Sequence, residues 1–156
     1  MNKYGKVNKS IIMRKSNKFN RTRKTGIVQN FQKENVIILL SFLNTLKLYH
    51  WKTHSYATHK ATDELYGKFS SNMDRFVEVL LGKIGNRINL QKINNIPIRN
   101  LNSTREMNIE IQRFKSYLIS LDNNKFMKLM SNADLYTIRD EIMADLNQFL
   151  YLLTFP

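Results

Sequence analysis

The chain reads HWKTHSYATHKATDELYGKFSSNMDRFVE over residues 50–78, and all of its histidines fall in the first ten residues of this stretch. His59 and Asp63 are four residues apart, as are Asp74 and Glu78. In a helix, each pair would lie one turn apart on one face. Imidazole and carboxylate groups concentrated in this way predict a metal site.

The two pairs cannot share one ion within a single chain. Asp63 and Asp74 are eleven residues apart, so on one helix they share a stripe but lie roughly 16 Å apart along the axis. Metal–ligand distances are about 2.0–2.2 Å. Two copies of the helix, packed antiparallel around a two-fold axis near Lys68 and Phe69, would bring the first pair of each chain against the second pair of the other. The spacing therefore predicts an isologous dimer with two equivalent metal sites.

Apolar residues recur at three- and four-residue steps in four segments after residue 33, which predicts four amphipathic helices. We expect the first two over residues 34–52 and 56–83, with Gly82 and Gly85 ending the second. A third should follow the capping-box spacing of 103–106 and end before 122–124. A fourth should follow the capping residues Ser131 and Asn132. With an irregular crossover over 84–102, the pattern predicts an all-α, ferritin-like four-helix bundle with a long crossover between helices 2 and 3.

Composition narrows the class of protein. A chain of 156 residues with 42% hydrophobic content can build one domain with a substantial core. The chain has no cysteine, which excludes disulfides and thiolate metal ligands. No segment has the continuous apolar core of a signal peptide or the ~18 apolar residues of a membrane span. We therefore expect a soluble, intracellular protein.

Positive charge is concentrated at the amino terminus. Residues 1–33 hold ten basic residues and no acidic one, so they carry most of the formal net charge of +13. We expect residues 1–33 to form a flexible basic arm and residues 34–156 to form the bundle. Such an arm binds DNA without sequence preference; an acidic membrane surface or a merely solubilising tail are the alternatives. The candidate DNA-binding residues are Lys3, Lys6, Lys9, Arg14, Lys15, Lys18, Arg21, Arg23 and Lys24.

Three motifs together resemble a known family. The chain has His-Trp at 50–51, His-x3-Asp at 59–63 and Asp-x3-Glu at 74–78. This order resembles the Dps branch of the ferritin-like superfamily, the DNA-binding proteins of starved cells. Segments 50–60, 138–145 and 151–153 look most like relatives in bacteriophages and large DNA viruses, which would agree with a virion or nucleoid location.

The resemblance implies a function and a set of site residues. In Dps proteins these motifs form a ferroxidase centre that two subunits share across a two-fold axis, and a basic amino-terminal arm binds DNA in several members. Trp51 would lie beside the iron and intercept stray oxidising equivalents. The same nitrogen and oxygen ligands also suit manganese and zinc, so iron follows from the resemblance alone. The implied metal ligands are His50, His59 and Asp63 of one chain with Asp74 and Glu78 of its partner.

The sequence departs from the Dps pattern in two places. The linker between His50 and His59 is a few residues shorter than in Dps proteins, and His54 within it has no counterpart, so we expect His54 at the surface. The crossover looks too short for the extra helix that Dps proteins place at their dimer interface. We therefore expect a homodimer, with a higher homo-oligomer as the alternative.

Other interpretations of the same residues stay open. His50 beside Trp51 is a common arrangement of packed core residues, and Trp51 should be buried with or without a metal. Tyr49 and Tyr56 are expected to pack at the helix junction. A further carboxylate pair, Glu141 and Asp145, reads as a solvated face more readily than as a metal site.

The chain as a whole has two alternatives to a Dps-like ferroxidase. It could be a non-enzymatic DNA-binding nucleoid or virion structural protein built on a ferritin-like dimeric scaffold. It could also be a small interaction module whose arm binds acidic proteins or membranes.

Overall fold

The computed structural model describes the backbone of residues 5–155 and the side chains of residues 24–155. Over this range the chain is helical, and none of the described residues forms a β-strand. Judged by length and hydropathy, none of the helices in this part of the chain could cross a lipid bilayer. The elements are α1 (Gly5–Lys52), α2 (Tyr56–Ile84), α3 (Thr104–Ser120), the short 3-10 turn η1 (Leu121–Asn123) and α4 (Ala133–Leu152).

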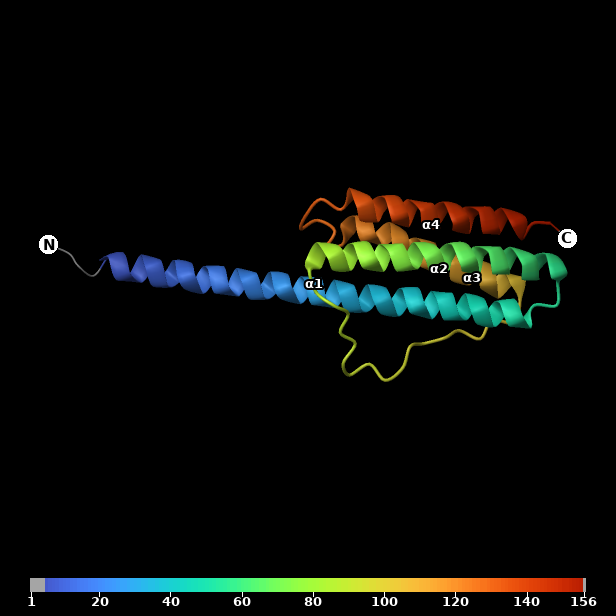
Figure 1. Ribbon diagram of the computed structural model, residues 1–156, viewed down its shortest axis with the longest axis horizontal. Helices are drawn as coiled ribbons and strands as arrows, with labels where there is room; N and C mark the ends of the chain where they lie inside the picture. The colour runs from blue at the N-terminus through green and yellow to red at the C-terminus, as the bar shows by residue number, and fades with distance from the viewer. Residues whose placement is uncertain (1–4, 156) are drawn as a thin grey trace.

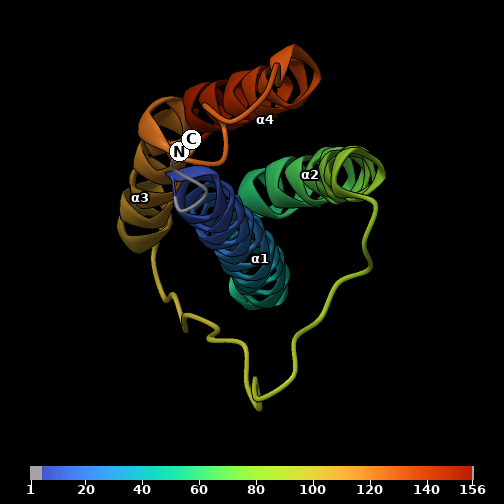
Figure 2. The ribbon, with the colours of Figure 1, turned by 90° about the vertical axis from the view of Figure 1, so that its left-hand side faces the viewer.

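The four helices form a bundle with one long crossover (Figures 1 and 2). α2 runs back antiparallel to α1, and the chain then returns along the outside of the bundle before α3 begins (Figure 1). α3 therefore runs parallel to α2, and α4 runs antiparallel to both. α2 packs against α1 and α4, and α4 packs against α3. The predicted all-α bundle with a crossover between its second and third helices is confirmed.

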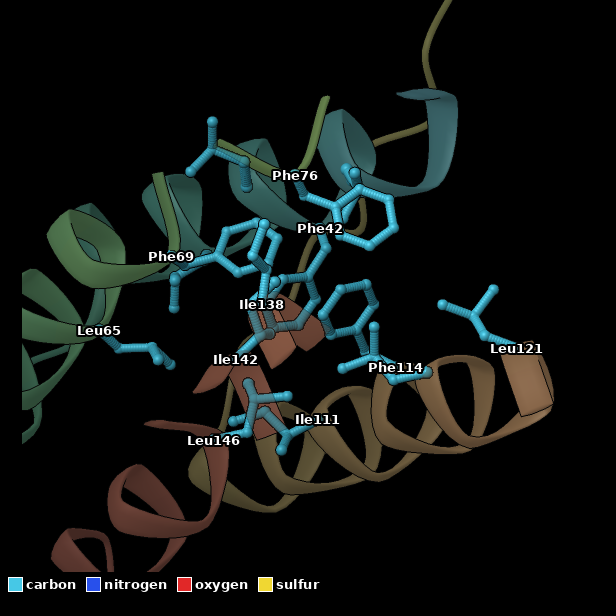
Figure 3. Packing of buried hydrophobic residues seen from close by; sticks show 14 of the residues in the cluster. Phe42, Leu65, Phe69, Phe76, Ile111, Phe114, Leu121, Ile138, Ile142 and Leu146 are labelled. Carbon is cyan, nitrogen blue, oxygen red and sulfur yellow. The ribbon is translucent and has the colours of Figure 1, made fainter. Parts of the chain in front are cut away.

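Phenylalanine rings from three helices meet at the centre of the bundle (Figure 3). The Phe42 ring of α1 stacks on Phe114 of α3 with 4.0 Å between ring centroids. Phe69 of α2 meets both rings edge-on, at 5.0 Å and 5.4 Å. Ile142 and Leu146 of α4 are buried in the same cluster. These contacts join all four helices in one core, which holds α1 and α2 in fixed positions beside each other.

α1 begins far earlier than the pattern predicts. The predicted start at Glu34 is wrong, because the helix runs from Gly5 and extends beyond the other helices (Figure 1). Among the side chains from residue 24 onward, Ile27 and Val28 are the first to pack on the core, and Phe31 stacks on Phe126 with 4.2 Å between centroids. Lysine and arginine are good helix formers, so a basic segment that adjoins a packed helix can continue it.

Hydrogen bonds fix the later helix ends and the crossover. At the start of α3 the Ser103 hydroxyl accepts a hydrogen bond from the Glu106 N–H at 3.2 Å, as the capping box predicts. At the start of α4, Asn132 makes no side-chain cap bond. It donates instead to the carbonyls of Met127 and Met130. The crossover is held against α1 because the Ser41 hydroxyl donates to the Pro97 carbonyl at 2.6 Å.

Gly85, and not Gly82, ends α2. Gly85 has φ +68° and its N–H donates to the Leu81 carbonyl at 2.9 Å, which is the left-handed cap that favours glycine. Gly82 lies inside the helix, so the expectation that it helps end α2 is wrong. A β-carbon at either position would meet no atom within 4 Å.

We expect opposite effects from alanine at these two glycines. Gly85→Ala should lower the free energy of unfolding by about 1 kcal/mol, because alanine is strained at positive φ. Gly82→Ala should raise it by about 0.5–1 kcal/mol, because alanine favours the helix interior. Urea unfolding followed by circular dichroism measures both variants. Equal effects of the same sign would contradict this placement of the helix end.

Candidate metal centre

The three-residue connection between α1 and α2 places His50 beside His59. His50 lies in the last turn of α1 and is only 6% exposed. His59 lies in the first turns of α2, and the two imidazole rings stack with 4.0 Å between their centroids. The short linker therefore does not keep His50 away from the second helix.

Hydrogen bonds orient both imidazole rings. His50 Nδ1 lies 3.2 Å from the His59 carbonyl oxygen and 3.2 Å from Thr62 Oγ1. The Thr62 hydroxyl lies within donating distance of the Thr58 and His59 carbonyls, at 2.8 and 2.9 Å. His59 Nδ1 in turn lies 3.2 Å from the His50 carbonyl oxygen. A carbonyl oxygen can only accept, so these contacts are hydrogen bonds in the tautomer whose Nδ1 carries the proton and donates it.

In that tautomer, the far nitrogen of each ring has a lone pair. A neutral imidazole with its proton on Nδ1 has an unprotonated Nε2, which is the form that binds metals. Metal-binding histidines in proteins almost always donate their other N–H to a carbonyl, carboxylate or water. His50 and His59 both have that second hydrogen bond.

Asp63 supplies a carboxylate to the same place. Its Oδ1 lies 3.7 Å from His50 Nε2, and its side chain is 58% exposed. Two ligands that are each about 2.1 Å from one ion lie about 3 Å from each other, so a small movement of the exposed carboxylate would suffice. The structure thus places His50 beside both His59 and Asp63.

Asp74 and Glu78 do not join them within the chain. Both lie on α2, the same unbroken helix that carries Asp63. Glu78 borders a hollow of about 430 Å³ at the far end of that helix. Among the side chains of residues 24–155, no group of three or more histidines and acids is arranged to hold a metal ion within one chain.

Trp51 is exposed, which corrects the prediction that it is buried. Its side chain is 69% exposed, because the next residue after the inward-facing His50 is turned about 100° around the helix. The Lys47 ammonium lies 5.8 Å from the Trp51 ring centroid and 4.3 Å from that of Tyr66. An indole therefore stands on the surface next to the histidine pair.

The other residues near the helix junction divide between core and surface. Tyr49 is buried, as predicted, and its hydroxyl lies 3.3 Å from Thr104 Oγ1. Tyr56 was predicted to pack but is 75% exposed. His54 is exposed, as predicted.

Glu141 and Asp145 bind cations of α2 across the helix interface. Glu141 forms an ion pair with Arg75. Asp145 lies 3.8 Å from the Lys68 ammonium and accepts a hydrogen bond from Asn72 at 3.2 Å. Both carboxylates therefore join α4 to α2, which is a structural role and not the purely solvated face that we predicted.

The candidate DNA-binding residues lie mostly where side chains are not described. Lys3 lies outside the described residues, and Lys24 is exposed on α1. The others contribute backbone to α1, and their side chains lie outside the described part. They are Lys6, Lys9, Arg14, Lys15, Lys18, Arg21 and Arg23.

Sequence reasoning missed Thr62, which is fully buried and orients His50. The available signal was its spacing, because a hydroxyl three residues after His59 lies on the same helix face. Threonine in a helix commonly bonds the carbonyl of the preceding turn. It then still offers a lone pair to a neighbouring donor, here His50.

Comparison with known proteins assigns the chain to a family. The model of a family described as "Family of unknown function (DUF5856)" matches residues 50–153. Neither the curated proteins nor the solved structures gave a match. The matched range begins at His50 and contains all the candidate metal ligands.

Proposed function

The chain belongs to the DUF5856 family of unknown function, and we propose that it is a Dps-like member of the ferritin-like superfamily. In this proposal the protein binds and oxidises Fe(II) at sites shared by two chains. It also associates with DNA through the basic amino-terminal part of α1 and so protects DNA from oxidative damage. Iron is the substrate of the reaction.

The histidine pair carries the proposal. Both Nδ1 atoms are committed to carbonyl acceptors at 3.2 Å, which leaves Nε2 of each ring as a ligand. Two histidines that only pack in the core would not both need an Nδ1 contact with the carbonyl of the other. A carboxylate 3.7 Å from one of the Nε2 atoms adds the hard oxygen ligand that iron prefers alongside imidazole.

A second chain can complete the site. A two-fold axis perpendicular to α2, midway between residues 68 and 69, exchanges His59 with Glu78 and Asp63 with Asp74. The same axis exchanges Gly67 with Ser70. Gly67 is exposed, and the position of its missing β-carbon is open, so two α2 helices can approach closely there.

The completed ligand set suits the reaction. Two imidazoles and three carboxylates from two chains would bind Fe(II), and the anionic oxygens would favour the Fe(III) product. Each Fe(II) gives one electron to dioxygen or peroxide, which is the oxidant. The exposed Trp51 beside His50 would intercept oxidising equivalents that escape.

The structural alternative has its own supporting observation. Within the described part of one chain, no three of these groups are arranged to hold a metal. If the dimer does not form as proposed, the bundle would be a scaffold for a DNA-binding nucleoid or virion protein without iron chemistry. Both candidates share the basic amino-terminal segment and differ in whether Fe(II) binds.

Fe(II) binding by the intact protein separates the two candidates. In an anaerobic titration we expect about one tightly bound Fe(II) per chain, which is two per symmetric dimer. His59→Ala/Asp63→Ala should lose this binding. A wild-type protein that binds no Fe(II) would overturn the ferroxidase proposal and leave the scaffold function.

A further inference from the structure

A basic, amide-rich groove lies at the opposite end of α2 from the histidines. It has a volume of about 480 Å³ and is formed by one face of α1 and the residues that follow α2. Three of its nine lining residues are cations and six are amides, so none is acidic. They are Gln29, Asn30, Gln32 and Lys33 of α1 with Asn86, Arg87, Asn89, Gln91 and Lys92.

The three cations of the groove have no acidic partner among residues 24–155. Other bundle cations, such as Lys83 and Arg139, form ion pairs between or within elements, whereas none of the described carboxylates pairs with Lys33, Arg87 or Lys92. Glu34 is next to Lys33 in sequence but forms no ion pair with it. The negative charge of Glu34 acts instead on Tyr117 of α3. Burial first and the charge of Glu34 second raise the pKa of Tyr117 above its ordinary value. The groove therefore presents uncompensated positive charge.

A buried amide of the groove lacks a hydrogen-bond partner. Gln32 is only 6% exposed, and no acceptor within the described protein bonds its Nε2 donor. An unpaired buried donor destabilises the folded protein, and native proteins rarely leave one unpaired.

Lys92 occupies a backbone position that favours glycine. Its φ is +72°, and the Ile93 N–H donates to the Leu90 carbonyl at 2.9 Å, so Lys92 is the third residue of a tight turn. Asn89 Oδ1 accepts from the Gln91 N–H at 2.9 Å and holds the turn. Non-glycine residues with positive φ are strained and cluster at functional sites.

We propose that this groove binds the phosphodiester backbone of nucleic acid, as a contact separate from the basic amino-terminal segment of α1. Lys33 lies about 14 Å along α1 from Lys24, so a polymer that follows the helix can reach both, whereas a small phosphate cannot. Side-chain amides and cations are the common donors to phosphate oxygens. The inference rests on the proposed association with DNA, and it extends the DNA-binding surface from the amino terminus onto the bundle.

The test is the salt dependence of DNA binding by the full chain. Lys33→Gln/Arg87→Gln/Lys92→Gln should reduce the magnitude of the negative slope of log K against log salt by about 0.9 for each phosphate that is no longer bound, and thus by up to about 3. The control Lys60→Gln/Arg105→Gln/Lys115→Gln removes the same charge away from the groove and should keep the wild-type slope. A mixed-sequence duplex is the probe. Lys92→Gly alone should reduce the magnitude of the slope by about 0.9, and it should also relieve the backbone strain at this positive φ.

Each outcome decides the inference. If the groove and control variants have equal slopes while removal of the amino-terminal cations weakens binding, the groove does not bind DNA and the proposed function stands. If the wild-type chain does not bind the duplex, both fail. If the groove cations are needed for binding to vesicles with acidic headgroups but not to DNA, the ligand is a lipid and the inference is wrong.

Discussion

Replacing Asp74 and Glu78 with alanine is expected to abolish Fe(II) oxidation. These carboxylates would complete the site that His50, His59 and Asp63 begin in the partner chain. Partners that only orient a metal ligand are already worth about 10- to 100-fold, so loss of two ligands should cost about 100-fold or more. The measurement is Fe(III) formation after anaerobic Fe(II) loading and addition of peroxide or air.

A matched control separates the loss of ligands from the loss of charge. Glu141→Ala/Asp145→Ala removes one glutamate and one aspartate with the same four-residue spacing, but from the α2–α4 interface. This variant should keep wild-type oxidation, although its thermal stability should fall slightly. If the Asp74/Glu78 variant oxidises iron as fast as wild type, these two residues are not ligands.

Deleting residues 1–24 is expected to abolish DNA binding at moderate salt. The deleted segment carries nine cations, and each phosphate contact contributes about 0.9 to the salt slope on duplex DNA. If all nine cations contact phosphates, they would therefore contribute up to about 8 to the magnitude of the slope of log K against log salt. The cut leaves Ile27 and Val28, which begin the core packing among the described side chains, so the bundle should remain folded. Fluorescence anisotropy with a labelled duplex measures the affinity.

Two controls accompany the deletion. A full-length chain with the nine cations changed to glutamine should lose DNA binding as the deletion does, which shows that charge and not length matters. The deleted protein should still oxidise Fe(II), because its candidate ligands lie after residue 49. DNA binding of unchanged affinity and salt slope after the deletion would show that this segment does not bind DNA.

Periodicity predicted the helices that pack on the core. α2 begins at the predicted residue, and Leu65, Phe69 and Phe76 are buried in it at helical spacing. The capping signal at Ser103 marked the start of α3 correctly. These features could be predicted because local sequence alone determines helix phase and caps.

Other features depend on the continuation of helices or on tertiary contacts. The basic segment lacks an apolar stripe, so its helix could be anticipated only from the packed part of α1 that follows. Trp51 was predicted to be buried, but its position in the last turn of α1 directs it outward. The hydrogen bond between Thr62 and His50 joins two helices, and the groove brings Lys33 of α1 near Lys92 of the segment after α2. Such contacts form only when distant segments are placed together.

The ligand set could be predicted in part. The spacing placed the His59/Asp63 pair and the Asp74/Glu78 pair on one helix, and the structure confirms that both lie on α2. Whether His50 lies beside His59 depends on the shape of the turn at 53–55, and residue spacing alone does not predict that shape. The structure shows His50 stacked on His59. The two-fold arrangement predicts that a second chain completes the site, and this remains a prediction.

Mixing two inactive variants tests the shared site most directly. One chain carries His59→Ala/Asp63→Ala and the other carries Asp74→Ala/Glu78→Ala, and the two are co-expressed in equal amounts. In a mixed dimer, one site lacks all four of these groups and the other retains every ligand. Random pairing makes half of the dimers mixed, so the account predicts about a quarter of the wild-type Fe(II) oxidation. No recovery beyond that of the separate variants would contradict a site built from two chains.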